Sequence, residues 1–261
     1  MNEWSQLTWQ ELRERRAQDP LVILPIGCVE TQGNHIPVGF EVILAERLAD
    51  AVAAELHGLR LPVLPFGNSD AFRDIPGTIF IQPETLTAIY TDILESIVRS
   101  GFTHILCIAM HEPNQSMIER AARLVSDRTG VRPVWVNPGK LAAGLLPELF
   151  PDPKVVRGHG AEPAASLARY LTRFVETHGD EAGEEPDPAI AAFDVVGAFL
   201  QIDGIAVGYP LRWNELYPVR GGYGDASQGS VTIGQQMFER LVDMLVQVGR
   251  AVLDSPSSRD R

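Results

Sequence analysis

The chain has 261 residues, of which 45% are hydrophobic and 21% are charged. This size and composition allow a large buried core, so we expect one α/β domain over residues 1–254 and a flexible tail at 255–261. The formal net charge of −12 argues against nucleic acid or an anionic membrane as a partner, because both bind clustered Lys and Arg. A small molecule is the expected partner.

The cysteines and the N-terminus bear on the compartment. Cys28 and Cys107 each lie in or beside an apolar run, the usual place of a reduced, buried thiol. We expect neither a signal peptide nor a transmembrane span, because no apolar segment approaches the length of about eighteen residues that a span needs. The sequence therefore predicts a cytoplasmic protein.

Short apolar runs rich in Val and Ile alternate with longer segments of helical periodicity. The runs predict strands at 21–26, 60–65, 103–110 and 132–136. The periodic segments predict helices at 41–57, 84–100, 114–128, 160–176 and 230–253. This alternation predicts an α/β protein with three layers, α/β/α, in which a mostly parallel central sheet has helices on both faces. The acidic segment 178–190 is predicted to be a solvated surface loop.

Three loops combine carboxylates with histidines. One follows the first strand, one follows the strand at 103–110, and one opens the helix at 160–176. Their residues are Glu30, His35, Glu41, His111, Glu112, His159 and Glu162. Because the carboxyl ends of parallel strands meet at one edge of a sheet, we expect these loops to converge there. Carboxylate oxygens and imidazole nitrogens bind divalent cations, although each residue taken singly also has an ordinary role on a protein surface or in a hydrogen bond.

Five blocks of the chain resemble the creatininase family of metal-dependent amidohydrolases, and they occur in the family's order. The first is Pro-Ile-Gly-Cys-Val-Glu-Thr-Gln-Gly-Asn-His-Ile-Pro-Val-Gly-Phe-Glu at 25–41, which is similar to the family's opening signature. The others lie at 75–86, 109–114, 159–166 and 221–226. The resemblance covers most of the chain and implies the family's α/β fold. It also implies a homo-oligomer, commonly a hexamer.

The resemblance implies two divalent metals, zinc or manganese, that activate a water for attack on an amide or cyclic amide carbon. Glu30 and His111 match ligands of one metal, and Glu41 stands at the place of an aspartate that bridges the two. His159 matches a histidine that contacts substrate or transfers a proton. Glu162 matches an acidic residue near the same centre.

The chain departs from the family pattern at several of these positions. Gln32 replaces a histidine ligand of the second metal, and an amide oxygen is a poorer zinc ligand than imidazole. Glu41 is one methylene longer than the bridging aspartate. Pro113 stands where relatives have a glutamate ligand, and Phe72 stands where many have a histidine. These departures predict that the second metal site is weakened or lost.

Three interpretations of the function follow. In the first, the chain is a hydrolase of a small amide, cyclic amide or related C–N bond that uses one metal, zinc or manganese. Its candidate metal ligands are Glu30, Glu41, His111, Gln32 and Glu162. Three protein ligands and a water suffice for such a centre.

The second interpretation is a different small-molecule reaction that needs little or no metal. Its acid and base groups are His35, Glu112 and His159. The third is a catalytically silent relative that binds a ligand or serves as an assembly subunit. In any of the three, aromatic residues are candidates for a pocket wall, with core packing as the alternative. They are Trp135, Trp213, Tyr217 and Tyr223.

Overall fold

A computed structural model describes residues 2–175, 194–196, 199–203, 205–207, 212–217 and 222–255. Four parallel strands form its central sheet in the order β2-β1-β3-β4. These strands are β1 (Val22–Ile26), β2 (Leu59–Arg60), β3 (Ile105–Ala109) and β4 (Val134–Val136). A separate antiparallel sheet has the order β5-β6-β7. Its strands are β5 (Asp194–Val196), β6 (Phe199–Ile202) and β7 (Ile205–Val207).

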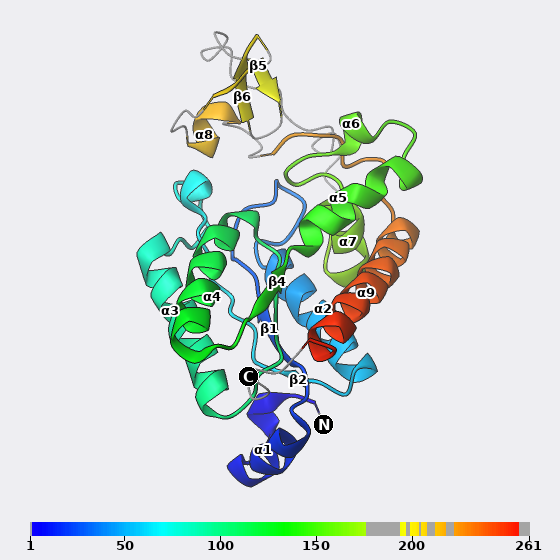
Figure 1. Ribbon diagram of the computed structural model, residues 1–261. Coiled ribbons are helices and arrows are strands. Elements are labelled where there is room, and N and C mark those ends of the chain that lie inside the picture. The colour runs from blue at the N-terminus through cyan, green and yellow to red at the C-terminus, as the bar shows by residue number, and fades with distance from the viewer. Residues whose placement is uncertain are drawn as a thin grey trace.

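The helices surround the central sheet and extend beyond its two ends (Figure 1). Those before β4 are α1 (Trp9–Arg15), α2 (Phe40–Glu55), α3 (Pro83–Arg99) and α4 (Gln115–Thr129). Those after β4 are α5 (Pro138–Leu149), α6 (Pro153–Val156), α7 (Ala164–Leu171), α8 (Trp213–Leu216) and α9 (Val231–Leu253). Short 3₁₀ turns include η3 (Asp70–Phe72) and η4 (Glu112–Asn114). Within the described residues, no helix combines the length and apolarity needed to cross a membrane.

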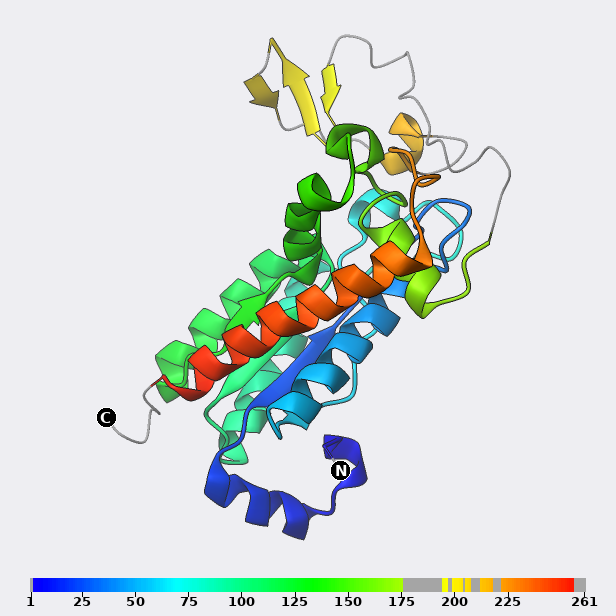
Figure 2. The ribbon, with the colours of Figure 1, turned by 90° about the vertical axis from the view of Figure 1, so that its right-hand side faces the viewer.

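Alternate residues of β1 and β3 point to opposite faces of the sheet. Ile23 and Ile108 belong to a buried cluster formed with residues of α2, α5, α7 and α9. Leu24 and Cys107 belong to a second buried cluster formed with residues of α3 and α4. Figures 1 and 2 show these two groups of helices on either side of the sheet. The predicted three-layer α/β/α fold with a parallel central sheet is confirmed.

Local sequence signals explain where several elements begin and end. Pro83 opens α3, because its fixed φ suits the first turn and its missing N–H has no partner to lose there. The hydroxyl of Ser230 caps α9 by accepting a hydrogen bond from the backbone N–H of Ile233, 3.2 Å away. Gly130 ends α4 in the left-handed conformation at φ 76°. The predicted helices at 41–57, 84–100, 114–128 and 230–253 correspond to α2, α3, α4 and α9.

Other sequence predictions need correction. The strand predicted at 60–65 ends at Arg60, because Pro62 and Pro65 lack the N–H groups that a central strand needs. Leu64 N still donates to the carbonyl of Pro25 at 3.0 Å, so the segment runs alongside β1. The helix predicted at 160–176 is only α7. The sequence did not predict α1, α5, α6, α8 or the antiparallel sheet, and the predicted loop at 178–190 and tail residues 256–261 lie outside the described residues.

The strand order creates a crevice at one edge of the central sheet. From β1 the chain runs through α2 to β2 on one side, then returns through α3 to β3 on the other side of β1. The helices that follow β1 and β3, α2 and α4, pack on opposite faces of the sheet, which leaves a crevice where these two strands end. Such a switch point is where α/β proteins bind ligands. Met110 N donates to the carbonyl of Ile26 at 2.9 Å, which holds the two strand ends together.

Gly27 lies where the end of β1 passes closest to α2. A Cβ at this position would lie 2.7 Å from the backbone N and Cα of Val42, and backbone atoms cannot rotate away as a side chain can. We expect Gly27→Ala to lower the free energy of unfolding by about 1–3 kcal/mol, measured by urea denaturation.

Gly144→Ala is the matched control for this substitution. Gly144 is exposed within α5, and a Cβ added there meets no atom within 4 Å. Since alanine favours a helix interior, this variant is expected to be as stable as the parent or more stable by up to about 1 kcal/mol. Equal effects of the two substitutions would contradict the close approach of β1 to α2.

Candidate metal centre

His111 lies at the end of β3 and is 3% exposed. Its Nε2 is 2.8 Å from the carbonyl oxygen of Asn68, and because a carbonyl only accepts, Nε2 carries a proton and donates it. Its Nδ1 is 3.2 Å from Oε2 of Glu41 and 3.3 Å from Sγ of Cys28. A histidine that donates one N–H to a backbone carbonyl and presents its other nitrogen to acidic groups has the arrangement typical of metal-binding histidines.

The buried amide of Asn114 fixes the carbonyl that orients His111. Its Oδ1 accepts a hydrogen bond from Asn68 N at 2.9 Å, and its Nδ2 donates to the carbonyl of Gly27 at 3.3 Å. Asn114 is fully buried at the start of α4. One side chain therefore ties together the end of β1, the loop before η3 and the segment after β3.

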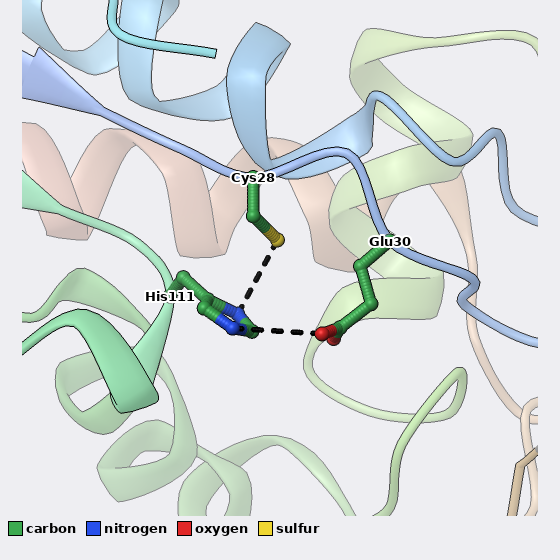
Figure 3. A group of neighbouring side chains, drawn as sticks. All are labelled: Cys28, Glu30 and His111. Atoms are coloured by element: carbon green, nitrogen blue, oxygen red, sulfur yellow. Dashed lines mark hydrogen bonds and ion pairs between the residues drawn. The ribbon is translucent and has the colours of Figure 1, made fainter. Parts of the chain in front are cut away.

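Two carboxylates and a thiol surround the His111 ring. Glu30, 2% exposed, places Oε2 3.5 Å from His111 Nε2, and that oxygen accepts no hydrogen bond from the described part of the chain. Glu41, in the first turn of α2, accepts a hydrogen bond from Cys28 Sγ at 3.0 Å. Figure 3 shows Cys28 and Glu30 pointing toward the His111 ring from the segment that follows β1. The loops after β1 and β3 thus converge as the sequence predicts.

Burial and mutual charge shift the pKa of each of these groups. Burial raises the pKa of Glu30 to about 7, although the His111 charge opposes the shift. Burial also acts to raise the pKa of Glu41, but the charge and hydrogen bond of His111 outweigh it and hold that pKa below its ordinary value. Burial lowers the pKa of His111, whereas the two glutamates together raise it to about 9. Burial, reinforced by both glutamates, raises the pKa of the Cys28 thiol well above its ordinary value.

This donor set fits a divalent cation. Cys28, Glu30 and His111 each offer a ligand atom, and those atoms lie within 4.8 Å of one another. Two N or O donors bound to one tetrahedral zinc lie about 3.3 Å apart, close to the 3.2 Å between His111 Nδ1 and Glu41 Oε2. A buried carboxylate oxygen without a hydrogen bond, as in Glu30, is costly unless a cation or proton satisfies it. The residues therefore fit one cation between the ends of β1 and β3.

Gln32 and Glu162, the other two predicted ligands, form hydrogen bonds with residues outside this group. Gln32 is buried and its backbone pairs with Ile36, but in the described part of the chain no hydrogen bond joins it to Glu30, Glu41 or His111. Glu162 is fully buried and accepts hydrogen bonds from Ser166, at 2.8 Å from the hydroxyl and 3.4 Å from the backbone N–H. Burial raises the pKa of Glu162 to about 7.

The three predicted acid and base residues occupy different environments. His35 is buried, donates from Nε2 to the carbonyl of Gly160 at 2.5 Å, and packs its ring near Phe174. His159 donates from Nε2 to the carbonyl of Thr31 at 2.7 Å, and burial lowers its pKa to about 4, so its ring is neutral at pH 7. Glu112 is exposed and forms an ion pair with Lys140 at 3.0 Å.

A pocket of about 510 Å³ opens over the candidate metal ligands. Its charged and polar lining includes Glu30, Glu41, His111, Glu112, His159 and Glu162, together with Lys140 and Arg157. His35 and Cys28 are absent from the described residues that line it. The predicted residues thus divide into a group that lines the pocket and a pair, His35 and Gln32, that is absent from the described lining.

Aromatic side chains form one wall of the pocket. Phe72 stacks on the His159 ring with centroids 4.3 Å apart, and Trp213 lies 4.6 Å from Phe72 and 5.8 Å from Tyr223. Arg212 holds α8 over the pocket through an ion pair with Asp70 of η3 at 2.9 Å. Of the other aromatic candidates, Tyr217 stacks behind this wall on Tyr223, whereas Trp135 packs with the α3 and α4 face of the sheet.

Several residues of the site are not evident from the sequence pattern. Cys28 is predicted only as a buried thiol, and neither Asn68 nor Asn114 is predicted as a site residue. Cys28 lies two residues before Glu30 in the same strand-end segment, so its position indicates a place in the site as clearly as that of Glu30 does. Asn68 acts through its backbone carbonyl, which side-chain chemistry does not reveal.

Comparison with known proteins identifies relatives of the chain. Residues 5–248 match the Creatininase family model, described as creatinine amidohydrolase. The chain is 29% identical to creatinine amidohydrolase of Pseudomonas putida over 119 residues, which are 43% of this chain and 46% of that protein. It is 26% identical over 97 residues to 3-dehydro-scyllo-inosose hydrolase of Thermotoga maritima, covering 37% of this chain and 31% of that protein. It is 29% identical over 83 residues to the mycofactocin precursor peptide peptidase of Mycobacterium tuberculosis, covering 28% of this chain and 33% of that protein.

The chain spans less than half the length of each of these curated relatives, all of which are hydrolases by name. Its fold is similar over a longer range to a crystal structure of creatinine amidohydrolase. The TM-score is 0.77 at 21% identity, covering 97% of this chain and 99% of that chain. The fold is also similar to a creatininase structure of a Zn–Zn type, with a TM-score of 0.76 at 21% identity, covering 97% of this chain and 98% of that chain. A creatininase structure with Mn has a TM-score of 0.75 at 22% identity and covers 97% of this chain and 99% of that chain.

The raised pKa of Glu162 predicts a pH-dependent effect on stability. The buried carboxyl titrates near pH 7, whereas in the unfolded chain it titrates near the ordinary value of 4.5. The folded state therefore favours the protonated form of Glu162. The contribution of this carboxyl to the stability of the folded state is complete below pH 4.5 and is lost as the pH rises through 7. We measure the free energy of unfolding of Glu162→Gln and of the parent by urea denaturation. As the pH rises from 5 to 9, we expect the difference between them to shift by about 3 kcal/mol in favour of the variant.

Glu112→Gln is the control, because it removes an exposed carboxylate from the rim of the same pocket. This variant should follow the pH profile of the parent. A constant difference between Glu162→Gln and the parent across the pH range would show that the Glu162 carboxyl does not titrate as described.

Proposed function

We propose that this chain, which belongs to the creatininase family, is a metal-dependent hydrolase of an amide, a cyclic amide or a related C–N bond in a small molecule. One observation carries the proposal: a buried histidine in contact with two carboxylates at the floor of a pocket. Buried ionisable groups of this kind are typical of metal and catalytic sites.

Glu30, Glu41 and His111 are the proposed ligands of one metal. A divalent cation bound to them would polarise a carbonyl oxygen and lower the pKa of a water. Three protein ligands leave a position open, so a single cation is sufficient for hydrolysis. Among the described residues, no hydrogen bond joins Gln32 to Glu30, Glu41 or His111, which supports one cation in place of two.

His159 is the proposed group for proton transfer. Its ring lines the pocket and is neutral at pH 7. Because Nε2 keeps its proton in the hydrogen bond to Thr31, Nδ1 is the atom that can accept a proton. Stacking on Phe72 holds the plane of the ring, which limits the directions from which a proton can arrive.

The pocket suits a small, flat substrate. Its volume of about 510 Å³ is within the usual range of small-molecule sites. The wall of Phe72, Trp213 and Tyr223 packs well on planar groups such as amides and rings. Lys140 and Arg157 add positive charge to the lining of the pocket. A substrate with a planar amide and a polar or anionic substituent fits this arrangement.

Metal content tests the proposal directly. After reconstitution with zinc or manganese and removal of excess, we expect about one metal per chain by elemental analysis. His111→Asn should hold less than about 0.2 metal per chain, because it removes the nitrogen ligand. The matched control is His57→Asn, which changes an exposed histidine after α2 and should retain the metal of the parent. A value below about 0.2 for the parent would contradict the metal centre and favour acid and base chemistry without metal.

Hydrolysis is then measured on a panel of cyclic amides, formamides and short peptides by the release of amine or carboxylate. The metal-loaded parent should hydrolyse at least one class, and His111→Asn should lose about 10²-fold or more of that rate. His57→Asn should keep the rate. Activity that is unchanged by His111→Asn would show that the centre is not the site of reaction.

A further inference from the structure

The thiol of Cys28 has no role in the proposed mechanism, yet it touches two of the proposed ligands. Its Sγ is 3.0 Å from Glu41 Oε2 and 3.3 Å from His111 Nδ1, and those two atoms are 3.2 Å apart. A sulfur, an oxygen and a nitrogen thus form a compact triangle. They come from the end of β1, the start of α2 and the end of β3.

The orientation of His111 directs Nδ1 toward this triangle. Nε2 is protonated because it donates to the carbonyl of Asn68, so only Nδ1 can bind a cation. Nδ1 is the atom that faces Cys28 and Glu41. A cation held by His111 is therefore in the neighbourhood of Cys28 Sγ.

The spacing of the triangle resembles one face of a coordination tetrahedron. For zinc bonds of about 2.3 Å to sulfur and about 2.0 Å to nitrogen, the two donors lie about 3.5 Å apart. The observed separation of 3.3 Å is slightly shorter. Glu30 supplies a second, independent observation, because its buried Oε2 accepts no hydrogen bond from the described residues and belongs to the same group of potential ligands.

Cys28 is poorly placed for attack on a substrate. It is 1% exposed and does not line the pocket in the part of the chain that the structure describes, whereas Glu30, Glu41 and His111 do. A nucleophile must reach the reacting carbon. A metal ligand needs to reach only the cation, which can lie between Cys28 and the pocket.

We propose that Cys28 Sγ is a ligand of the metal, in place of Glu30 in the set of three given above. Cys28, Glu41 and His111 then hold a single cation, with Glu30 and the pocket on its open side. This inference rests on the metal-dependent function proposed above. Binding exchanges the S–H bond of Cys28 for a metal–sulfur bond and displaces the proton that His111 Nδ1 carries when its ring is charged. Both protons pass to solvent, with no change of oxidation state. Because thiolate is a soft ligand, the centre selects zinc over manganese.

A cobalt-substituted protein tests thiolate ligation spectroscopically. Co²⁺ bound in the parent should give visible d–d bands and, in addition, a near-ultraviolet charge-transfer band from sulfur to cobalt. Cys28→Ser should keep the visible bands, lose the charge-transfer band and bind Co²⁺ about 10-fold or more weakly. Cys107→Ser is the matched control, because it alters the other buried thiol, within β3, and should keep the band.

The outcomes separate this inference from the proposed function. Visible bands without a charge-transfer band in the parent would overturn thiolate ligation and leave the metal centre intact. No Co²⁺ binding at all would overturn both. In competition between zinc and manganese, Cys28→Ser should reduce the preference for zinc about 10-fold or more, and an unchanged preference would contradict the proposed selectivity. If Cys28→Ser does not fold, X-ray absorption of the zinc-loaded parent decides, with one sulfur expected at about 2.3 Å.

Discussion

The His111 ring lies buried between two carboxylates where β1, β3 and α2 meet, and the surrounding residues serve to hold that contact. Removing such charges from water costs several kcal/mol per ion, so the arrangement persists only if each group has a partner. Asn68 supplies one through its carbonyl, and Asn114 fixes that carbonyl. A cation held beside the Glu30 oxygen that accepts no hydrogen bond from the described residues would relieve the remaining negative charge.

The topology of the sheet explains why this contact forms at a pocket. The order β2-β1-β3-β4 sends the helices that follow β1 and β3 to opposite faces of the sheet. This leaves a crevice at the two strand ends, where their polar residues meet. The chain closes part of that crevice with α8, which Arg212 anchors to η3. The chain thus has the fold of its family, and a buried thiol lies at this crevice, with Cys28 Sγ 3.3 Å from His111 Nδ1.

The sequence predicted the layers, four of the long helices and the meeting of Glu30, Glu41 and His111, because periodicity and strand-end position encode these features. It overestimated the strand at 60–65, since apolar character does not show the missing N–H groups of Pro62 and Pro65. It did not reveal Cys28 as a neighbour of His111, because that contact depends on how β1 and β3 pair and on the rotation of the ring. It named Trp213 and Tyr223 as candidates for a pocket wall, and both line the pocket. It did not predict α8, because a helix of four residues has too little periodicity to recognise.

We expect one cation to bind between the ends of β1 and β3. A crystal structure of the zinc-loaded protein, with anomalous data collected on both sides of the zinc edge, would locate it. A single anomalous peak is expected within about 2.0–2.3 Å of Cys28 Sγ, Glu41 Oε2 and His111 Nδ1. Two peaks, a peak bound by Gln32, or no peak in this crevice would contradict this expectation.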